Sequence, residues 1–270
     1  MSKRNLAIGV IDSGVGGLTS VATIKKILPK ENIIYCGDNG NAPYGNRSGQ
    51  EIVQLTSRIF DFLQKKEVKV VAVACNTISS TLNSDEFNHY EKNFGFEAIS
   101  VIAPVVEDVL KKNYEQVGVV ATAFTIKTGR YQQLIQNRNK NIQVYGEPSR
   151  KLAELIEQGD LQGSAIKDEV QSLVRNLLTA HPNLKEIILG CTHYPIVQSQ
   201  FEAAAPGVQF INPALDQALA VQKYLEDNHL ITDCNQGDMQ IYTSGEEPIY
   251  HTVLDELGLS KDLPVHLKTF

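Results

Sequence analysis

Two short aliphatic runs, in matching places of the two halves of the chain, each stop at a cysteine. Residues 70–74 lead to Cys75, and residues 187–190 lead to Cys191. Small polar residues follow both cysteines at once. A short apolar run that ends in a polar cluster is typical of a fully buried parallel strand followed by a loop. Because ligands of open α/β sheets bind at the carboxyl ends of strands, we expect both thiols at a binding edge.

Similar apolar runs recur along the whole chain and alternate with helical stretches. One of the predicted helices opens with Ser48 and Glu51, which have the spacing of a capping box. This alternation favours an α/β fold built on parallel sheets. Strands are predicted at residues 6–11, 33–36, 68–74, 98–102, 117–123, 142–145, 187–190, 208–211 and 239–243.

The pattern restarts midway along the chain. The string VGVVATA, from Val117, is similar to IGVIDSG, from Ile8, and the two cysteines lie at a similar offset. We therefore expect two similar parallel-sheet α/β domains related by pseudo-twofold symmetry, with the active site between them. The first domain is expected at residues 1–97 plus 208–270, and the second at residues 98–207. Because no Gly/Ser-rich linker separates them, they are expected to pack tightly.

Composition argues against several classes of function. The chain has 270 residues, 42% of them hydrophobic, and a net charge of −6, as suits a globular protein with a substantial core. The sequence has no dense Lys/Arg block for nucleic acid and no apolar stretch for a membrane or a signal peptide. Its four cysteines lack zinc spacing. Free thiols favour a cytoplasmic protein without a metal site.

The two cysteines at strand ends are candidates for chemistry. A buried cysteine is often only a small hydrophobic residue, but these two have polar neighbours. Asn76 and Thr77 follow Cys75, and His193 lies two residues beyond Cys191. A free thiol has a pKa of about 8.5, so a nearby base or several amide donors can convert it to a thiolate. His193 is therefore a candidate to set the protonation state of Cys191.

The opening loop DSGVGG, which starts at Asp12, allows three interpretations. The carboxylate can cap the following helix, or the bare amides can bind a phosphate. A dinucleotide fingerprint would need glycine where Thr19 stands, so that signal is weak. In the third interpretation Asp12 polarises Cys75 or carries its proton, and the loop amides hold a substrate carboxylate. The turn-rich loop at residues 40–46 is either a surface turn or a wall of the substrate site.

Together these strings resemble the glutamate racemases of the cofactor-independent Asp/Glu racemase superfamily. In the expected order they are IGVIDSGVGGL, the GD…APYG stretch, VACNT, VGVV with the threonines after it, LIEQG and LGCTHYP. The DSGVGGL and GCTHYP forms favour the glutamate branch, because aspartate racemases usually have a different glycine-rich opening and GCTE. The chain departs from the family pattern at GDNGNA, where GDTAR is frequent, and at Asn212, where Asp is frequent.

The resemblance implies a racemisation by two bases, with no pyridoxal phosphate, other cofactor or metal. Cys75, assisted by Asp12, would take the Cα proton of D-glutamate. Cys191, assisted by His193 and Glu157, would take that of L-glutamate. The resemblance also implies a homodimer and a supply of D-glutamate for peptidoglycan. The substrate would be lined by Ser13, Pro43, Tyr44, Gly45, Asn76, Thr77, Thr122, Thr125 and Thr192.

Three alternatives stay open at this point. The chain could racemise aspartate or another acidic amino acid with the same two thiols. It could be a non-catalytic binding protein on the same fold, although the presence of Asp12, Cys75 and Cys191 argues for an enzyme. It could also be a phosphate-binding α/β enzyme that uses the DSGVGG loop.

Overall fold

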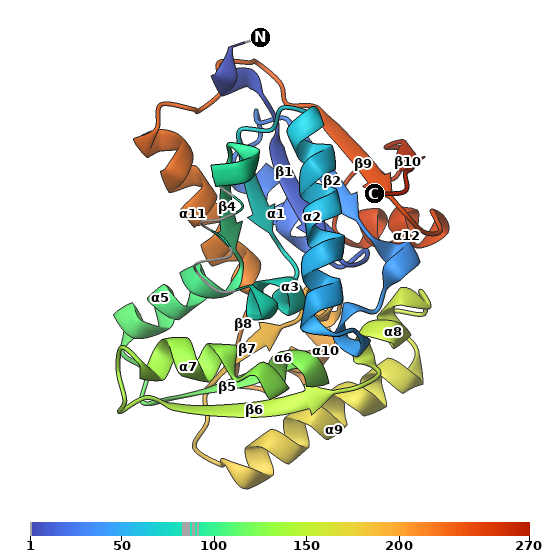
Figure 1. Cartoon of the computed structure of the whole chain (residues 1–270). Helices are drawn as coiled ribbons and strands as arrows, with labels where there is room; N and C mark the ends of the chain where they lie inside the picture. Colours follow the sequence, from blue (N-terminus) through green and yellow to red (C-terminus); the bar gives the residue numbers. More distant parts are fainter. Residues whose placement is uncertain (1, 83–86, 88–89, 91) are drawn as a thin grey trace.

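The computed structural model describes residues 2–82, 87, 90 and 92–270. Within these residues the strands form one sheet of six and one of four, and every strand pairing is parallel. Figure 1 shows the larger sheet, with both ends of the chain, above the smaller one. The predicted fold class, α/β with two parallel sheets, is confirmed.

The larger sheet has the strand order β10-β9-β2-β1-β3-β4. The three strands at its centre, β2, β1 and β3, are buried at every residue, as expected of continuous aliphatic runs covered on both faces. The strands are β1 (Ile8–Asp12), β2 (Ile33–Gly37), β3 (Val70–Val73), β4 (Glu97–Ser100), β9 (Met239–Thr243) and β10 (Val265–Leu267).

The smaller sheet repeats the topology of the larger one. Its order, β6-β5-β7-β8, corresponds to β2-β1-β3-β4 of the larger sheet. Cys75 follows the third strand of the first unit, and Cys191 follows the third strand of the second. The internal repeat in the sequence is therefore a repeat of topology. The strands are β5 (Gln116–Thr122), β6 (Gln143–Ser149), β7 (Glu186–Gly190) and β8 (Gln209–Ile211).

The chain passes from one sheet to the other a few residues later than the expected domain boundaries. Strand β4 pairs with β3, although the expected division assigns residues 98–100 to the second domain. Strand β8 pairs with β7, although that division assigns residues 208–211 to the first. A linear pattern locates a strand, but only backbone pairing decides which sheet the strand joins. We therefore propose boundaries after Ser100 and after Ile211, and the division into domains stays a prediction.

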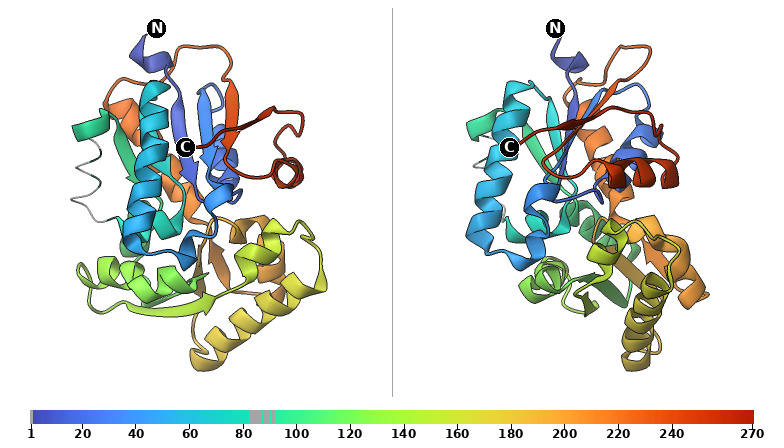
Figure 2. Two further views of the ribbon diagram at one scale, coloured as in Figure 1. Left: turned by 45° about the vertical axis from the view of Figure 1, so that its right-hand side comes forward. Right: turned by 90° about the vertical axis from the view of Figure 1, so that its right-hand side faces the viewer.

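Helices cover both faces of the sheets (Figures 1 and 2). The capping box is present at the start of α2, where Ser48 and Glu51 each accept a hydrogen bond from the other's backbone. Sequence reasoning missed several short elements, among them α3, α6, α7, α10 and β10, because they contain too few residues to show a period. The longer helices are α1 (Leu18–Ile27), α2 (Gly49–Lys65), α5 (Ile102–Lys112), α9 (Ser164–Ala180), α11 (Pro213–Asp227) and α12 (Pro248–Glu256), and the shorter ones are α3 (Asn76–Thr81), α6 (Ala123–Thr128), α7 (Arg130–Gln136), α8 (Leu152–Glu157) and α10 (Gln198–Ala204).

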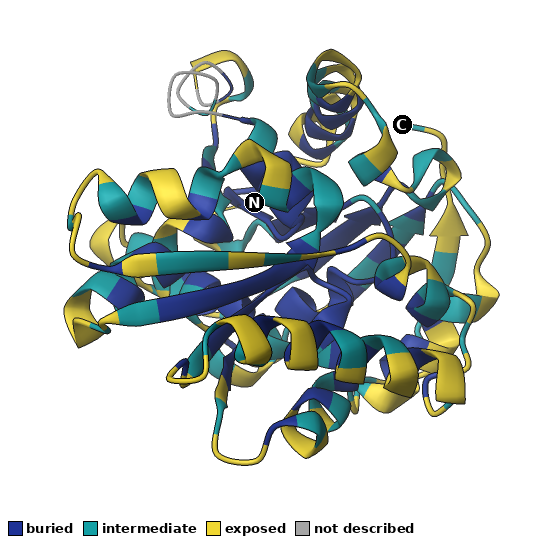
Figure 3. Cartoon of the chain, turned by 90° about the horizontal axis from the view of Figure 1, so that it is seen from below, coloured by how far each residue is buried: buried dark blue, intermediate teal, exposed yellow. Residues whose placement is uncertain are grey.

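Strand β3 divides its side chains between two layers of the core. Val70 lies in a cluster with residues of α1 and α11, whereas Val71 lies in another with residues of α2, because neighbouring side chains of a strand point to opposite faces. The first cluster continues into the smaller sheet through Val120 and Leu189, so the two halves share one core. Figure 3 shows buried residues continuing through the interior between the helices. In the described part of the chain no helix is long and apolar enough to cross a membrane.

Candidate active site

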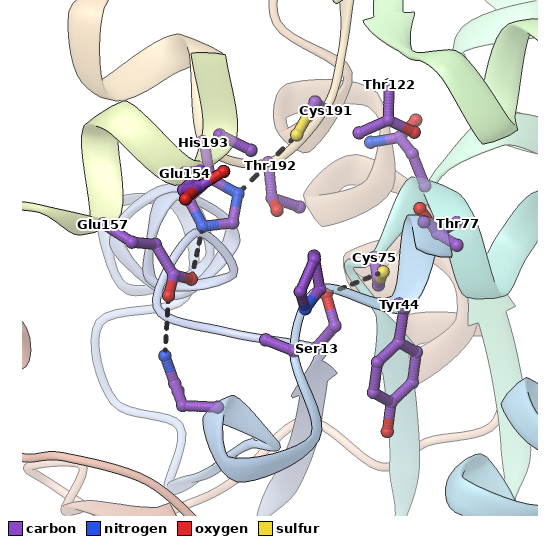
Figure 4. Close-up of a pocket in the computed structure, with 16 residues that line it drawn as sticks. Ser13, Tyr44, Cys75, Thr77, Thr122, Glu154, Glu157, Cys191, Thr192 and His193 are labelled. Carbon is purple, nitrogen blue, oxygen red and sulfur yellow. Dashed lines mark hydrogen bonds and ion pairs between the residues drawn. The ribbon is translucent and has the colours of Figure 1, made fainter. Parts of the chain in front are cut away.

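Cys75 and Cys191 line one cavity of about 170 Å³ where the carboxyl ends of the two sheets meet (Figure 4). Cys75 follows β3 and is the N-cap of α3. Cys191 follows β7 and comes shortly before the 3₁₀ turn Tyr194–Val197. Their exposed fractions are only 4% and 6%. Each of the two sheets therefore brings one nearly buried thiol to a shared cavity, at the carboxyl end of a strand where ligands of α/β sheets bind.

Most residues expected at the site line this cavity. Two expected residues lie behind its wall. Asp12 is fully buried, and Thr125 is 1% exposed with its hydroxyl bonded to that of Thr122 at 3.0 Å. The expected residues on the wall are Ser13, Pro43, Tyr44, Gly45, Cys75, Asn76, Thr77, Thr122, Glu157, Cys191, Thr192 and His193.

Sequence reasoning missed four residues of the wall: Asn39, Ala42, Ala153 and Glu154. The last two lie one helical turn before Glu157 on α8, so the i, i+3 and i, i+4 spacing could have identified them. Asn39 directly precedes the predicted turn-rich loop and Ala42 lies within it, and no local pattern distinguishes either from surface residues.

His193 connects Cys191 to Glu157. Its Nδ1 atom lies 3.6 Å from the sulfur of Cys191, and its Nε2 atom lies 2.8 Å from Oε1 of Glu157. Glu157 also accepts hydrogen bonds from the backbone N of Val15 at 3.4 Å and from Nδ2 of Asn39 at 3.3 Å. Each ring nitrogen therefore has a partner that can accept a hydrogen bond from an N–H group. An imidazolium, which has an N–H on both nitrogens, can use both partners.

The pKa values on this wall favour a charged pair. Burial disfavours the imidazolium of His193, but its bonds to Cys191 and Glu157 outweigh burial and hold its pKa well above the usual value. Burial likewise opposes the carboxylate of Glu157, yet the hydrogen bond from His193 brings its pKa below the usual value. His193 therefore places a cation beside the sulfur of Cys191.

The opposite wall holds Cys75 as a thiol. Its sulfur donates to the hydroxyl of Ser13 at 3.5 Å. Burial, and then the negative charge of Asp12, raise the pKa of Cys75 to about 12. The carboxylate of Asp12 accepts from the backbone N of Gly14 at 3.0 Å and from Oγ1 of Thr192 at 3.1 Å. It thereby ties the loop after β1 to the loop that carries Cys191.

The glycines of the DSGVGG loop allow the two halves to approach closely. A Cβ atom on Gly16 would lie 2.8 Å from the backbone N of His193, closer than real Cβ contacts occur. A Cβ atom on Gly14 would overlap the carboxylate of Glu157. Close packing between the two halves therefore explains why glycine stands at these positions, and no phosphate ligand is needed to explain it.

Hydrogen bonds behind the wall position its polar groups. Buried Asp38 accepts from the hydroxyl of Tyr44 at 2.6 Å and from Nδ2 of Asn41 at 3.0 Å, which holds the turn-rich loop. Tyr131 of α7 donates to Oδ1 of Asn76 at 2.7 Å. That bond leaves the amide NH₂ of Asn76 as a donor for a bound molecule.

The arrangement combines a proton donor and a proton acceptor on walls that come from different sheets. The described residues that line the cavity include no Lys or Arg, so hydroxyls, amides and His193 are its hydrogen-bond donors. A small anion whose charge grows during a reaction would be stabilised by such fixed dipoles. Within the described residues, no group of three or more His, Cys, Asp or Glu side chains is arranged to hold a metal ion.

Comparisons with known proteins give one consistent family. Residues 8–221 match the family described as Asp/Glu/Hydantoin racemase. Glutamate racemase 3 of Caldanaerobacter subterraneus subsp. tengcongensis is 37% identical over 244 residues, which cover 89% of this chain and 86% of that protein. The glutamate racemase of Herpetosiphon aurantiacus is 36% identical over 245 residues, which cover 90% of this chain and 94% of that protein.

A solved structure agrees over nearly the whole length. The crystal structure of glutamate racemase from Francisella tularensis subsp. tularensis, in complex with D-glutamate, superposes with a TM-score of 0.86 at 31% identity and covers 98% of both chains. The similarity therefore includes both sheets.

Proposed function

The chain belongs to the Asp/Glu/hydantoin racemase family, and from that premise we propose that it is a glutamate racemase, an isomerase that interconverts L- and D-glutamate without a cofactor. The observation that carries the proposal is the pair of thiols, Cys75 and Cys191, on the walls of one cavity. Inversion at Cα removes a proton from one face and returns a proton to the other. Two acid–base groups on separate walls meet that need without rotation of the substrate.

In each turnover the proposed reaction transfers, in net terms, one proton from one thiol position to the other. With L-glutamate, Cys191 as thiolate accepts the Cα proton, and the S–H of Cys75 delivers a proton to the opposite face of the carbanion. The enzyme then has a thiolate at Cys75 and a thiol at Cys191, which is the starting state for D-glutamate. The raised pKa of Cys75, about 12 through burial and the charge of Asp12, supports its role as donor in the first direction.

The Cα proton is very weakly acidic, so the site has to stabilise the carbanion. We assign this work to neutral donors aimed at the α-carboxylate, where the negative charge increases. Closure of the two halves over the substrate would exclude water and strengthen these bonds. The proposed donors are the side chains of Ser13, Asn76 and Thr77 and the amides near Pro43, Tyr44 and Gly45. Thr122 and Thr192, whose hydroxyls donate to Thr125 and Asp12, complete the wall around the substrate.

The test is incubation of the purified protein with L-glutamate in D₂O, without pyridoxal phosphate. We expect D-glutamate that carries deuterium at Cα, measured by chiral chromatography with mass spectrometry. Cys75→Ala and Cys191→Ala should each reduce racemisation by about 10³-fold or more, because each removes an acid–base group. Cys234→Ala is the matched control, since Cys234 is a free thiol that is not part of the cavity wall. Normal racemisation by either active-site variant would disprove the two-base assignment.

The same assay distinguishes the competing functions. Faster turnover of aspartate than of glutamate would assign the chain to another branch of the family. Binding of glutamate without deuterium exchange would indicate a non-catalytic protein. Tight nucleotide binding measured by calorimetry would favour the phosphate-binding alternative.

We further propose that the product supplies peptidoglycan synthesis in the cytoplasm and that the protein is a homodimer. Free cysteines support a reducing compartment, and two exposed leucines on α11, Leu215 and Leu219, provide apolar surface for a second copy. Growth of a D-glutamate auxotroph on expression of the chain tests the first proposal. Light scattering tests the second, and a monomer mass at micromolar concentration would contradict it.

A further inference from the structure

We propose that Asn39, held by Tyr250, is a positioning residue that orients Glu157 and through it the His193–Cys191 pair. The inference rests on the proposed racemisation, because only in that reaction does the orientation of His193 beside Cys191 affect catalysis. Asn39 lines the cavity and is not among the residues expected there from the sequence.

The contacts form a continuous path from the C-terminal helix to the thiol. The hydroxyl of Tyr250, on α12, donates to Oδ1 of Asn39 at 2.5 Å. Nδ2 of Asn39 donates to Oε2 of Glu157 at 3.3 Å. Oε1 of Glu157 lies 2.8 Å from Nε2 of His193, whose Nδ1 lies 3.6 Å from the sulfur of Cys191. Figure 4 shows Glu157, His193 and Cys191 joined in this order by dashed lines.

The network fixes the orientation of the amide of Asn39. Its oxygen faces two hydroxyls, that of Tyr250 and that of Thr243 at 3.4 Å, both of which can donate. If the amide were reversed, its oxygen would face the carboxylate of Glu157, and two acceptors would meet without a proton. Tyr250 and Thr243 are both fully buried, so the support for Asn39 is rigid.

The bond from Asn39 crosses between the two halves of the molecule. Asn39 lies just after β2 of the larger sheet, whereas Glu157 ends α8, which packs with the smaller one. Each carboxylate oxygen of Glu157 receives one donor from the larger-sheet half: the backbone N of Val15 at Oε1 and Nδ2 of Asn39 at Oε2. The terminal torsion of a glutamate side chain is broad. Without Asn39, the carboxylate can turn away from His193.

Several other titratable groups face Glu157 and His193, and their charges set the background for any pH effect. Burial raises the pKa of Asp12 to about 6 and holds the pKa values of Tyr35 and Tyr250 well above the usual value, so both tyrosines stay neutral. The facing groups are Asp12 on β1, Tyr35 on β2, Glu154 on α8, Cys191 after β7 and Tyr250 on α12.

The first measurement is the titration of His193 by ¹⁵N NMR in the substrate-free protein. The signal is assigned by its loss in His193→Gln. In Asn39→Ala we expect the pKa of His193 to fall by about half a unit or more, because a freely turning carboxylate stabilises the imidazolium less. Tyr250→Phe should shift it in the same direction by a smaller amount, since Asn39 then keeps its donor but loses its main anchor.

The second measurement is the pH profile of kcat/KM for glutamate. Loss of the Asn39 bond should raise the pKa of Glu157 and lower the pKa of His193. The pH range in which Glu157 is ionised and His193 is protonated should therefore become narrower at both its acidic and its basic limit. We expect kcat/KM to fall about 10-fold in Asn39→Ala, as for the loss of one hydrogen bond to a charged group. The double variant Asn39→Ala/Tyr250→Phe should be no worse than Asn39→Ala alone, because Tyr250 acts through Asn39.

Tyr242→Phe is the matched control for loss of a tyrosine hydroxyl. Tyr242 lies on β9, and its hydroxyl contacts Lys66 and Gln240 away from the cavity. It should leave both the titration and the profile unchanged. An unchanged His193 titration in Asn39→Ala, or strictly additive losses in the double variant, would overturn the proposal. A shifted titration in a protein that fails to racemise glutamate would support the positioning role and reject the proposed function instead.

Discussion

At the scale of single residues, Asp12 is the clearest case in which the site works against stability. It is fully buried, and burial raises its pKa from 3.8 to about 6, although His193, the amide of Gly14 and the hydroxyl of Thr192 all favour the carboxylate. The native state therefore keeps the proton of Asp12 to a higher pH than the unfolded chain does. The stability that this proton provides is complete below pH 3.8 and is lost as the pH rises through about 6.

Asp12→Asn should separate stability from activity. The amide oxygen can still accept from Gly14, and the amide NH₂ can donate to the hydroxyl of Thr192 in a reversed bond. Because no charge is then buried, we expect the free energy of unfolding at pH 8 to increase by up to about 3 kcal/mol. The gain should shrink toward zero at pH 4, where the wild-type carboxyl is protonated when folded. Racemisation should fall strongly at every pH. Urea unfolding at the two pH values measures the effect, with exposed Asp168→Asn as the control. An equal gain at both pH values would contradict this account.

At the scale of elements, strands were predicted more reliably than short helices. The strand predicted at residues 239–243 is β9 as observed, and the one predicted at residues 68–74 is observed within that range as Val70–Val73. Continuous aliphatic runs identify buried strands because both of their faces need apolar side chains. The six-residue helix α3 begins directly after Cys75, and its hydroxyl-rich sequence lacks an apolar period. Tertiary packing, rather than local propensity, makes it helical.

Helix α2 is an element whose start is encoded locally. The hydroxyl of Ser48 accepts from the backbone N of Glu51 at 3.3 Å, and the carboxylate of Glu51 accepts from the backbone N of Ser48 at 2.9 Å. Ser48→Ala should lower the free energy of unfolding by about 1 kcal/mol. Ser48→Thr, which keeps the hydroxyl, should retain most of the stability. Thermal or urea unfolding measures both, and an equal loss in both variants would mean that the cap contributes little.

At the scale of the whole molecule, the amino edge of the larger sheet carries a buried ion pair, on the side away from the cavity. Lys69 pairs with Glu31 and donates to the carbonyl of Leu230 at 2.9 Å, while Glu31 accepts from the backbone N of Thr232 at 2.9 Å. Lys69 and Glu31 are 0% and 1% exposed. The pair therefore joins the starts of two strands to the segment that follows α11.

Loss of one partner of this pair should be costly for stability and neutral for activity. Glu31→Gln leaves the ammonium of Lys69 buried without its counter-charge, so we expect a loss of about 3–5 kcal/mol in the free energy of unfolding. Asp233→Asn is the comparison, because its pair with Arg4 at 3.4 Å is solvent-exposed and should contribute about 1 kcal/mol or less. Folded Glu31→Gln should keep kcat/KM. Similar small losses in the two variants would contradict the predicted difference.

The sequence alone determined the alternation of strands and helices, the two thiols at strand ends and the family of the chain. Each of these depends on residues that are neighbours along the chain, where periodicity and capping act. His193, two residues beyond Cys191, could be assigned for the same reason.

Only the tertiary structure decided which distant residues meet. Asn39 bonds to Glu157 across 118 positions of sequence, and Thr192 bonds to Asp12 across 180. Thr125 lies behind Thr122 rather than on the wall, because the turn into α6 points its hydroxyl at its neighbour. Such contacts depend on how two sheets pack over a shared core, and side-chain packing at a junction leaves no period in the sequence.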